Sequence, residues 1–361
     1  MLKDDKAPAE ADPTGVVLAQ AAEPGEVSAV WLVHSGRAVP LRTWAATWPC
    51  ARFSSVTELV QQWDSHRAGL QRLIEQPQTA DTIAENGVPV MRLRVESPLR
   101  PAQLFCTIGN YRRQVVEAAV DAADSADAEI VRATTEAALR QRQRDGAPYV
   151  CLTSIDRIAG PFGELLLDPT IDTLDWEVEV GVVIGGSGSG LNLAEAGAAV
   201  AGYSVVNDLT IRSRVLRRDL PGLGSDWLQC KGLHGSLPLG PWFVPAWQVS
   251  GLAALRLRLS LNGIPMQDGT VDDMVFSIPQ QLSYLSRHTR LRPGDLLCTG
   301  SPAGFGVHHG RLLRSGDVVH ASVTGLGEQA TRIVDQTGRR ESYPLRHPAW
   351  HSTADEKEHA S

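Results

Sequence analysis

The stretch LDWEVEVGVVIGG, residues 174–186, places two glutamates directly before a run of valine and isoleucine residues. The apolar run is typical of a buried β-strand. Because side chains alternate along a strand, Glu177 and Glu179 are expected on one face, about 7 Å apart at the backbone. Two like charges at the mouth of a buried strand are costly unless a cation or other partners neutralise them. The stretch therefore predicts a buried strand with a charged site at its beginning.

A third carboxylate, Asp208, ends the apolar stretch GYSVVND at residues 202–208. Ligation by a few carboxylates, with water and substrate completing the shell, suits Mg²⁺, Mn²⁺ or Ca²⁺ rather than zinc. The spacing leaves another interpretation open. The glutamates could pair with arginines instead, and Asp208 could cap a following helix.

The second part of the chain, residues 99–348, alternates many β-branched segments with tight turns rich in Gly and Pro. Many strands and few helices predict an α+β, β-rich roll or sandwich rather than a doubly wound sheet. Residues 115–146 differ, because they are rich in alanine and charged residues, and they predict a long helix or helix pair that moves over a site. The strand candidates are Leu104–Ile108, Trp176–Ile184, Gly202–Val206, Leu255–Leu261, Leu296–Thr299 and Val318–Thr324.

The first part of the chain predicts a small N-terminal α+β domain at residues 27–98. Two short apolar runs around Ser35 and Gly36 indicate a hairpin. Apolar residues at helical spacing from Ser55 to Glu75 indicate a helix, with Ser54 or Ser55 as its cap. Residues 1–26 and 349–361 have the composition of disordered tails.

Composition narrows the functional classes. A net charge of −7 and the absence of a basic block argue against a nucleic-acid-binding protein. The five cysteines are widely spaced without a CxxC pair, which fits a reducing compartment. The chain begins without a secretory signal pattern, and no stretch approaches the roughly 18 apolar residues of a membrane span. We therefore expect a cytoplasmic protein with neither nucleic-acid nor membrane partners.

Six segments, taken in order, resemble the fumarylacetoacetate hydrolase family over nearly the whole second domain. The resemblance implies the mixed β-roll of that family, usually a homodimer, with a divalent metal, Mg²⁺ or Mn²⁺, at its centre. It also implies a small anionic oxo acid as substrate. The segments are CTIGNYRRQVVE (106–117), LDWEVEVGVVIGG (174–186), GYSVVNDLTIRS (202–213), KGLHGSLPLGPWFV (231–244), GDLLCTGSPAGFGV (294–307) and LRSGDVVHASVTGLG (313–327).

The family's metal carboxylates fall on Glu177, Glu179 and Asp208, and its active-site lysine falls on Lys231. An ammonium group beside an enolate could stabilise its developing negative charge.

The family's substrate contacts fall on two other segments. The TGTP turn appears here as TGSP, in which the hydroxyl of Ser301 could hydrogen-bond a substrate carboxylate, although TGSP can also be an ordinary turn. The resemblance further places three residues at the lip of the cleft: Asn110, Tyr111 and Arg112.

The chain departs from the family at the water-activating pair. Many members carry a histidine three residues before a glutamate on the lid, and the corresponding residues here are Gln114 and Glu117. An amide has no usable pKa, so Gln114 can orient a water molecule but cannot act as a general base. His234, His308 and His309 lie next to the matching segments, and one of them could substitute.

Two reaction types follow from this departure. The first is hydrolysis of a C–C bond in a 1,3-dioxo acid through a metal-stabilised enolate, with Glu117 positioning the water. The second is isomerisation, decarboxylation or (de)hydration of a 2-oxo or enol acid, with Lys231 or Glu117 moving protons. Gln114 favours the second type, and the family name favours the first. A catalytically lapsed, ligand-binding member is a third hypothesis, and the intact carboxylate set speaks against it.

Overall fold

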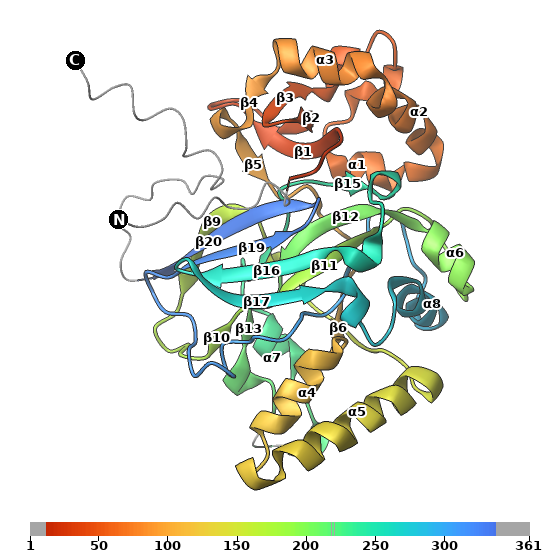
Figure 1. Ribbon diagram of the computed structural model, residues 1–361. Helices are drawn as coiled ribbons and strands as arrows, with labels where there is room; N and C mark the ends of the chain where they lie inside the picture. The colour runs from red at the N-terminus through yellow and green to blue at the C-terminus, as the bar shows by residue number, and fades with distance from the viewer. Residues whose placement is uncertain (1–11, 218, 220, 337–361) are drawn as a thin grey trace, which may run out of the picture.

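The computed structural model describes residues 12–217, 219 and 221–336 (Figure 1). The predicted tail at 349–361 lies outside the described residues, as do residues 1–11. Figure 1 shows a small N-terminal unit at one end of the molecule, a β-rich body in the middle and a pair of helices at the opposite end. The fold is α+β and rich in β-structure, as predicted.

The N-terminal unit is a five-stranded sheet in the order β4-β3-β2-β1-β5, accompanied by three helices. The predicted hairpin is confirmed, because β2 pairs with β3 across a turn in which Ser35 and Gly36 have φ of 47° and 73°. The predicted helix is divided at Gln62, and the Ser55 hydroxyl caps its first half by accepting from the Glu58 amide at 3.1 Å. The elements are β1 (Val17–Ala22), β2 (Ala29–His34), β3 (Arg37–Pro40), β4 (Val88–Pro89), β5 (Arg94–Glu96), α1 (Val56–Gln61), α2 (Trp63–Glu75) and α3 (Pro77–Asn86).

The expected disorder of residues 1–26 is wrong for the part that the structure describes. Strand β1 lies between β2 and β5, and all six of its residues are buried. Leu18 also exchanges two backbone hydrogen bonds with Phe243, at 3.1 and 2.9 Å, which join this sheet to the second domain. The alanine- and acid-rich composition concealed the strand, because small side chains suit a crowded position inside the sheet.

The body contains two larger sheets. One has six strands in the order β15-β12-β11-β18-β6-β7, and the other has five in the order β17-β16-β19-β20-β9. All six predicted strand segments are strands of these sheets. The six-stranded sheet comprises β6 (Leu104–Ile108), β7 (Tyr149–Leu152), β11 (Val178–Ile184), β12 (Val200–Asn207), β15 (Val244–Pro245) and β18 (Leu296–Cys298). The other comprises β9 (Phe162–Leu167), β16 (Arg256–Leu261), β17 (Ile264–Thr270), β19 (Val318–Val323) and β20 (Gly327–Asp335).

Strand β11 forms the core of the six-stranded sheet. All seven of its residues are buried, and it pairs with β12 on one side and β18 on the other. Val178, Val180 and Val182 pack into the main hydrophobic cluster and Val183 packs into a second one, so both faces of the strand are apolar. Further helices lie around the body: α6 (Leu193–Ala198), α7 (Trp227–Lys231) and α8 (Ile278–His288).

The alanine-rich segment forms a helix pair, α4 (Arg112–Asp121) and α5 (Ala128–Asp145), inserted between β6 and β7. Each helix buries a single residue, Val116 in α4 and Leu139 in α5. These two side chains form a small cluster with Val275 and Phe276. The pair is therefore held to the body by little apolar surface, as expected for an element that can move. No helix in the described part of the chain is long and apolar enough to cross a membrane.

Close packing in the six-stranded sheet provides a stability prediction. A Cβ atom on Gly202 of β12 would lie 2.3 Å from the Val244 carbonyl oxygen and 2.7 Å from the Phe243 ring. We expect Gly202→Ala to lower the free energy of unfolding by about 1–3 kcal/mol, because overpacking forces backbone shifts. The control is Gly163→Ala in β9, where nothing lies within 4 Å of the new carbon. Urea denaturation of the two variants measures the difference, and equal stabilities would contradict this account of the packing.

Candidate metal centre

The pairing of β11 with β12 brings three carboxylates together. Val178 pairs with Asn207, so Glu177 stands opposite Asp208, and the Asp208 amide donates to the Glu177 carbonyl at 2.8 Å. Glu179 lies two residues further along β11 and therefore on the same face. One oxygen from each of Glu177, Glu179 and Asp208 lies within 4.8 Å of the other two, and all three residues are buried. The predicted carboxylate cluster is therefore present.

Lys231, at the end of α7, points into this cluster. Its Nζ lies 2.5 Å from Asp208 Oδ2 and 3.3 Å from Glu177 Oε2, and it donates to Thr210 Oγ1 at 2.8 Å. Burial alone would lower the pKa of Lys231, but the charges of Asp208 and Glu177 raise it above its ordinary value. Lys231 is therefore a buried, positively charged group beside the carboxylates.

Two arginines that sequence reasoning missed complete the charged cluster. Arg157 is fully buried, donates to Asp208 Oδ1 and also bonds Ser236 Oγ at 3.1 Å. Burial alone would raise the pKa of Asp208, but Arg157 and Lys231 lower it to about 2. The alternative that Asp208 caps a helix is wrong, because the short strand β13 (Thr210–Ile211) follows it.

Arg212 pairs with Glu177 and with a fourth carboxylate. Its Nη1 lies 2.6 Å from Glu177 Oε1, and its Nε lies 2.8 Å from Asp175 Oδ2. The alternative that a glutamate pairs with an arginine is thus correct for Glu177. The guanidinium also lies over the Phe305 ring, 4.4 Å from its centroid. Asp175 and Arg212 lie inside two of the quoted segments, and this position is the one sequence signal that could have pointed to them.

Glu179 differs from its neighbours, because it takes part in no ion pair within the described part of the chain. Its Oε2 accepts from the Gly300 amide at 2.8 Å. Burial raises the pKa of Glu179 well above its ordinary value, and the charges of Asp208 and Glu177 raise it further.

The balance of charges favours a cation at this position. Of the four buried carboxylates, Asp175, Glu177 and Asp208 pair with Arg157, Arg212 or Lys231, and among the described residues Glu179 has no cationic partner. Oxygen donors at this spacing fit a divalent ion such as Mg²⁺ or Mn²⁺. The residues present therefore fit the metal that the sequence predicts.

A cavity of about 260 Å³ opens onto this cluster. Gln114 and Ala118 of α4 form one wall, and Ser301 and Phe305 lie on another. The Ser301 hydroxyl donates to the Val178 carbonyl at 2.9 Å and accepts from Gln267 Nε2 at 2.9 Å. The residues that bring charge to the cavity are Glu177, Lys231 and Arg212.

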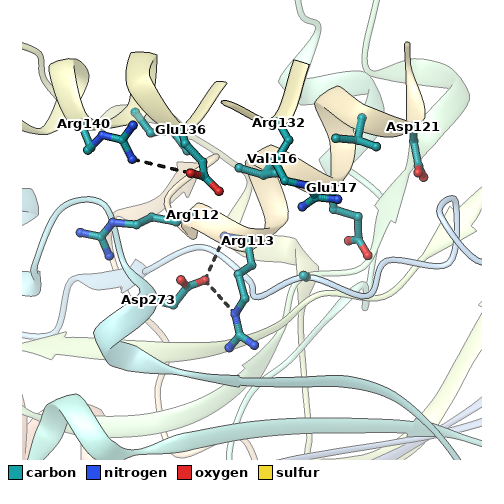
Figure 2. A pocket seen from close by; sticks show the side chains of 12 residues that line it. Arg112, Arg113, Val116, Glu117, Asp121, Arg132, Glu136, Arg140 and Asp273 are labelled. Carbon is teal, nitrogen blue, oxygen red and sulfur yellow. Dashed lines mark hydrogen bonds and ion pairs between the residues drawn. The ribbon is translucent and has the colours of Figure 1, made fainter. Parts of the chain in front are cut away.

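A separate, larger cavity of about 620 Å³ lies on the other side of α4, between α4 and α5 (Figure 2). Glu117 lines this cavity and not the one at the carboxylates, so the structure does not bring Glu117 together with Gln114 and Lys231. Glu117 Oε2 accepts from the Gly304 amide at 2.9 Å. Arginines and acids alternate around the cavity, with ion pairs Arg113–Asp273 and Arg140–Glu136, both at 3.6 Å.

The residues predicted at the lip occupy different places. Asn110 is buried, and its side chain bonds the backbone of Phe276 and Thr299 at 3.0 to 3.1 Å, so it fastens the TGSP turn. Tyr111 is also buried. Arg112 lines the larger cavity and donates to the Asp272 carbonyl at 3.1 Å.

The three candidate histidines do not line the carboxylate cavity. His234 and His309 are exposed. His308 lies beside Asp121 and Glu117 of α4, with its Nδ1 2.5 Å from Asp121 Oδ2 and its Nε2 4.0 Å from Glu117 Oε2.

Comparison with known proteins gives a consistent result. A family model described as "Fumarylacetoacetate (FAA) hydrolase C-terminal" matches residues 103–334. A 2,4-didehydro-3-deoxy-L-rhamnonate hydrolase of Sphingomonas sp. (strain SKA58) is 35% identical over 189 residues, which are 52% of this chain and 65% of that protein. A mitochondrial oxaloacetate tautomerase of Homo sapiens is 34% identical over 189 residues, which are 52% of this chain and 59% of that protein. The chain thus matches less than two thirds of the length of these curated relatives.

Among solved structures, the maleylpyruvate hydrolase of Sphingobium sp. SYK-6, in complex with manganese(II) and pyruvate, matches with a TM-score of 0.63 and 19% identity. The match covers 88% of this chain and 99% of that chain. It shows that the two proteins share a fold, which confirms the expected β-roll.

The lack of a cationic partner for Glu179 among the described residues leads to a metal-binding prediction. We expect Mn²⁺ at about 100 times its dissociation constant to stabilise the wild-type protein by about 2.7 kcal/mol. Glu179→Gln should lose most of this gain, because an amide is a weaker ligand than a carboxylate. Glu164→Gln, at an exposed position of β9, is the control and should behave as wild type. Thermal unfolding with and without Mn²⁺ provides the readout, and an undiminished shift in Glu179→Gln would remove Glu179 from the metal site.

Proposed function

The chain belongs to the fumarylacetoacetate hydrolase family, and we propose that it is a divalent-metal-dependent enzyme that hydrolyses a C–C bond in a small 1,3-dioxo or 2-oxo acid. One observation supports the proposal: the buried cluster of Glu177, Glu179 and Asp208 borders a cavity of about 260 Å³ through Glu177 and the adjoining Lys231. The named relatives, a hydrolase and a tautomerase of oxo acids, support an enzyme of this class.

The carboxylates would hold Mg²⁺ or Mn²⁺, and the manganese(II) and pyruvate in the Sphingobium hydrolase of the same fold support this choice. A divalent ion in such a site acts as a Lewis acid toward substrate oxygens.

The side chains of the cavity itself suit an anionic substrate. The Lys231 ammonium is fixed by three hydrogen bonds, so it needs no reorganisation to stabilise negative charge that develops on a bound oxo acid. Arg212 Nη2 is buried without a hydrogen-bond partner among the described residues, and a substrate carboxylate in the cavity could accept from it. An arginine fork suits a carboxylate in both charge and shape.

A second reaction type has a specific observation in its favour. Hydrolysis needs an activated water, yet Glu117 lines the neighbouring cavity and the Gln114 amide cannot remove a proton. Isomerisation, decarboxylation and dehydration need no attacking water. The tautomerase among the relatives supports this alternative.

A metal-supplemented screen of dioxo, 2-oxo and enol acids distinguishes the reactions by product mass. Two products whose masses add up to the substrate plus one water are expected if the proposed hydrolysis is correct. A single product heavier by one water indicates hydration, and loss of CO₂ indicates decarboxylation. An unchanged mass with a changed absorbance spectrum indicates isomerisation, and loss of water indicates dehydration. Glu179→Gln should reduce turnover of any active acid at least about 100-fold if the ion contributes as a typical electrostatic stabiliser. No turnover of any acid, with Mn²⁺ bound, would favour a ligand-binding protein.

Substitution of Gln114 by histidine tests whether the lack of a general base limits the rate of hydrolysis. We expect Gln114→His to fold normally and to raise hydrolysis of an acylpyruvate about tenfold or more, because imidazole can act as a general base. Gln143→His, on the exposed face of α5, is the matched control. Initial rates under saturating Mn²⁺ measure the effect. A folded but inactive Gln114→His protein would mean that the amide itself is required.

A further inference from the structure

His308 joins helix α4 to the turn that follows the TGSP motif. Its Nδ1–H donates to Asp121 Oδ2 at 2.5 Å, and its Nε2 lies 4.0 Å from Glu117 Oε2. Glu117 and Asp121 are one helical turn apart, and Figure 2 shows both carboxylates on the same part of α4. Glu117 also accepts from the Gly304 amide of the same turn at 2.9 Å. Two acids of one helix thus bind one short turn of the body.

The same turn reaches the carboxylate cluster on its other side. The His308 ring stacks on Phe305 with centroids 6.0 Å apart and planes 16° apart. Phe305 lines the carboxylate cavity and lies under the guanidinium of Arg212, which pairs with Glu177. A continuous series of contacts therefore connects α4 with the floor of the site.

Few other contacts fix the position of α4. Val116 is its one buried residue, and at its first turn Arg112 donates to the Asp272 carbonyl and the Arg113 amide donates to Asp273 Oδ2, both at 3.1 Å. The Arg113–Asp273 ion pair is 60% exposed at the arginine. A half-exposed ion pair of this kind contributes little. The His308 side chain is 11% exposed, whereas that of Asp121 is 46% exposed, so water reaches their contact from the helix side only. Gln114 and Ala118, on the adjacent face of α4, form a wall of the carboxylate cavity.

We propose that His308 is a positioning residue, which holds α4 against the 304–308 turn through Asp121 and Glu117 and thereby keeps Gln114 at the carboxylate cavity. Both ring nitrogens face carboxylates of α4, and His308 does not line the carboxylate cavity. Its role is therefore to place the helix and not to contact the substrate. The effect on turnover rests on the proposed function, whereas the effect on the placement of α4 does not.

Hydrogen exchange of the α4 amides in the Mn²⁺-loaded full chain tests the placement. His308→Ala should accelerate exchange of residues 112–121 about tenfold or more, because a hydrogen bond to a charged acceptor is lost. His309→Ala, the exposed neighbour, should leave it unchanged. His308→Asn should recover part of the protection, because its amide can donate to Asp121. Unchanged α4 exchange in His308→Ala, with the α8 amides as internal reference, would overturn the proposal.

Asp121→Ala provides an independent variant should His308→Ala fold poorly. It should accelerate α4 exchange as His308→Ala does, and the double variant should add little, because both changes break one contact. Additive effects of the two substitutions would overturn the proposed contact.

The effect of His308 on catalysis is measured by steady-state kinetics with an acid that the wild type converts. We expect His308→Ala to lower kcat about tenfold with a smaller change in KM, and His308→Asn to restore part of kcat. Accelerated α4 exchange with unchanged kcat would overturn the positioning role. If the wild type converts no acid, the proposed function fails, and the exchange experiment still decides whether His308 seats α4.

Discussion

Buried negative charge at the start of β11 is the constraint on which the rest of the site depends. Strand pairing places Glu177, Glu179 and Asp208 together, and all three side chains are buried. Isolated ionised carboxylates cannot persist in such a place, so each must meet a cation or bind a proton. The positions of Lys231, Arg157 and Arg212 follow from this requirement.

The cations are themselves costly to bury, which explains how thoroughly they are bound. Arg157 has no exposed surface, and it bonds Ser236, the Leu209 carbonyl and Asp208. Buried ion pairs of this kind add little net stability, but removal of one partner leaves an unpaired charge and typically costs about 3–5 kcal/mol. The cluster is therefore a rigid arrangement in which oxygen and nitrogen atoms have fixed places before any substrate arrives.

The sequence predicted those features that depend on local periodicity. The two-residue spacing of Glu177 and Glu179 and the apolar run after them indicated the strand and its charged face. Periodicity could not reveal Arg157 and Arg212, because long-range pairing brings them to the site from separate short elements. Periodicity also could not reveal that Gln114 lines one cavity and Glu117 another. That depends on how helix α4 is oriented against the body of the protein. Strand β1 was missed because its alanines carry little strand signal.

The helix pair α4–α5 leaves from β6 and returns to β7, which are neighbouring antiparallel strands. The two ends of the insertion therefore lie side by side, and its length can change without moving a strand of the core. Such a segment can be lengthened, shortened or replaced while the sheet keeps its strand order. Because α4 forms a wall of the carboxylate cavity, a change in this insertion would alter that wall, while the charged cluster, built into paired strands, would keep its place.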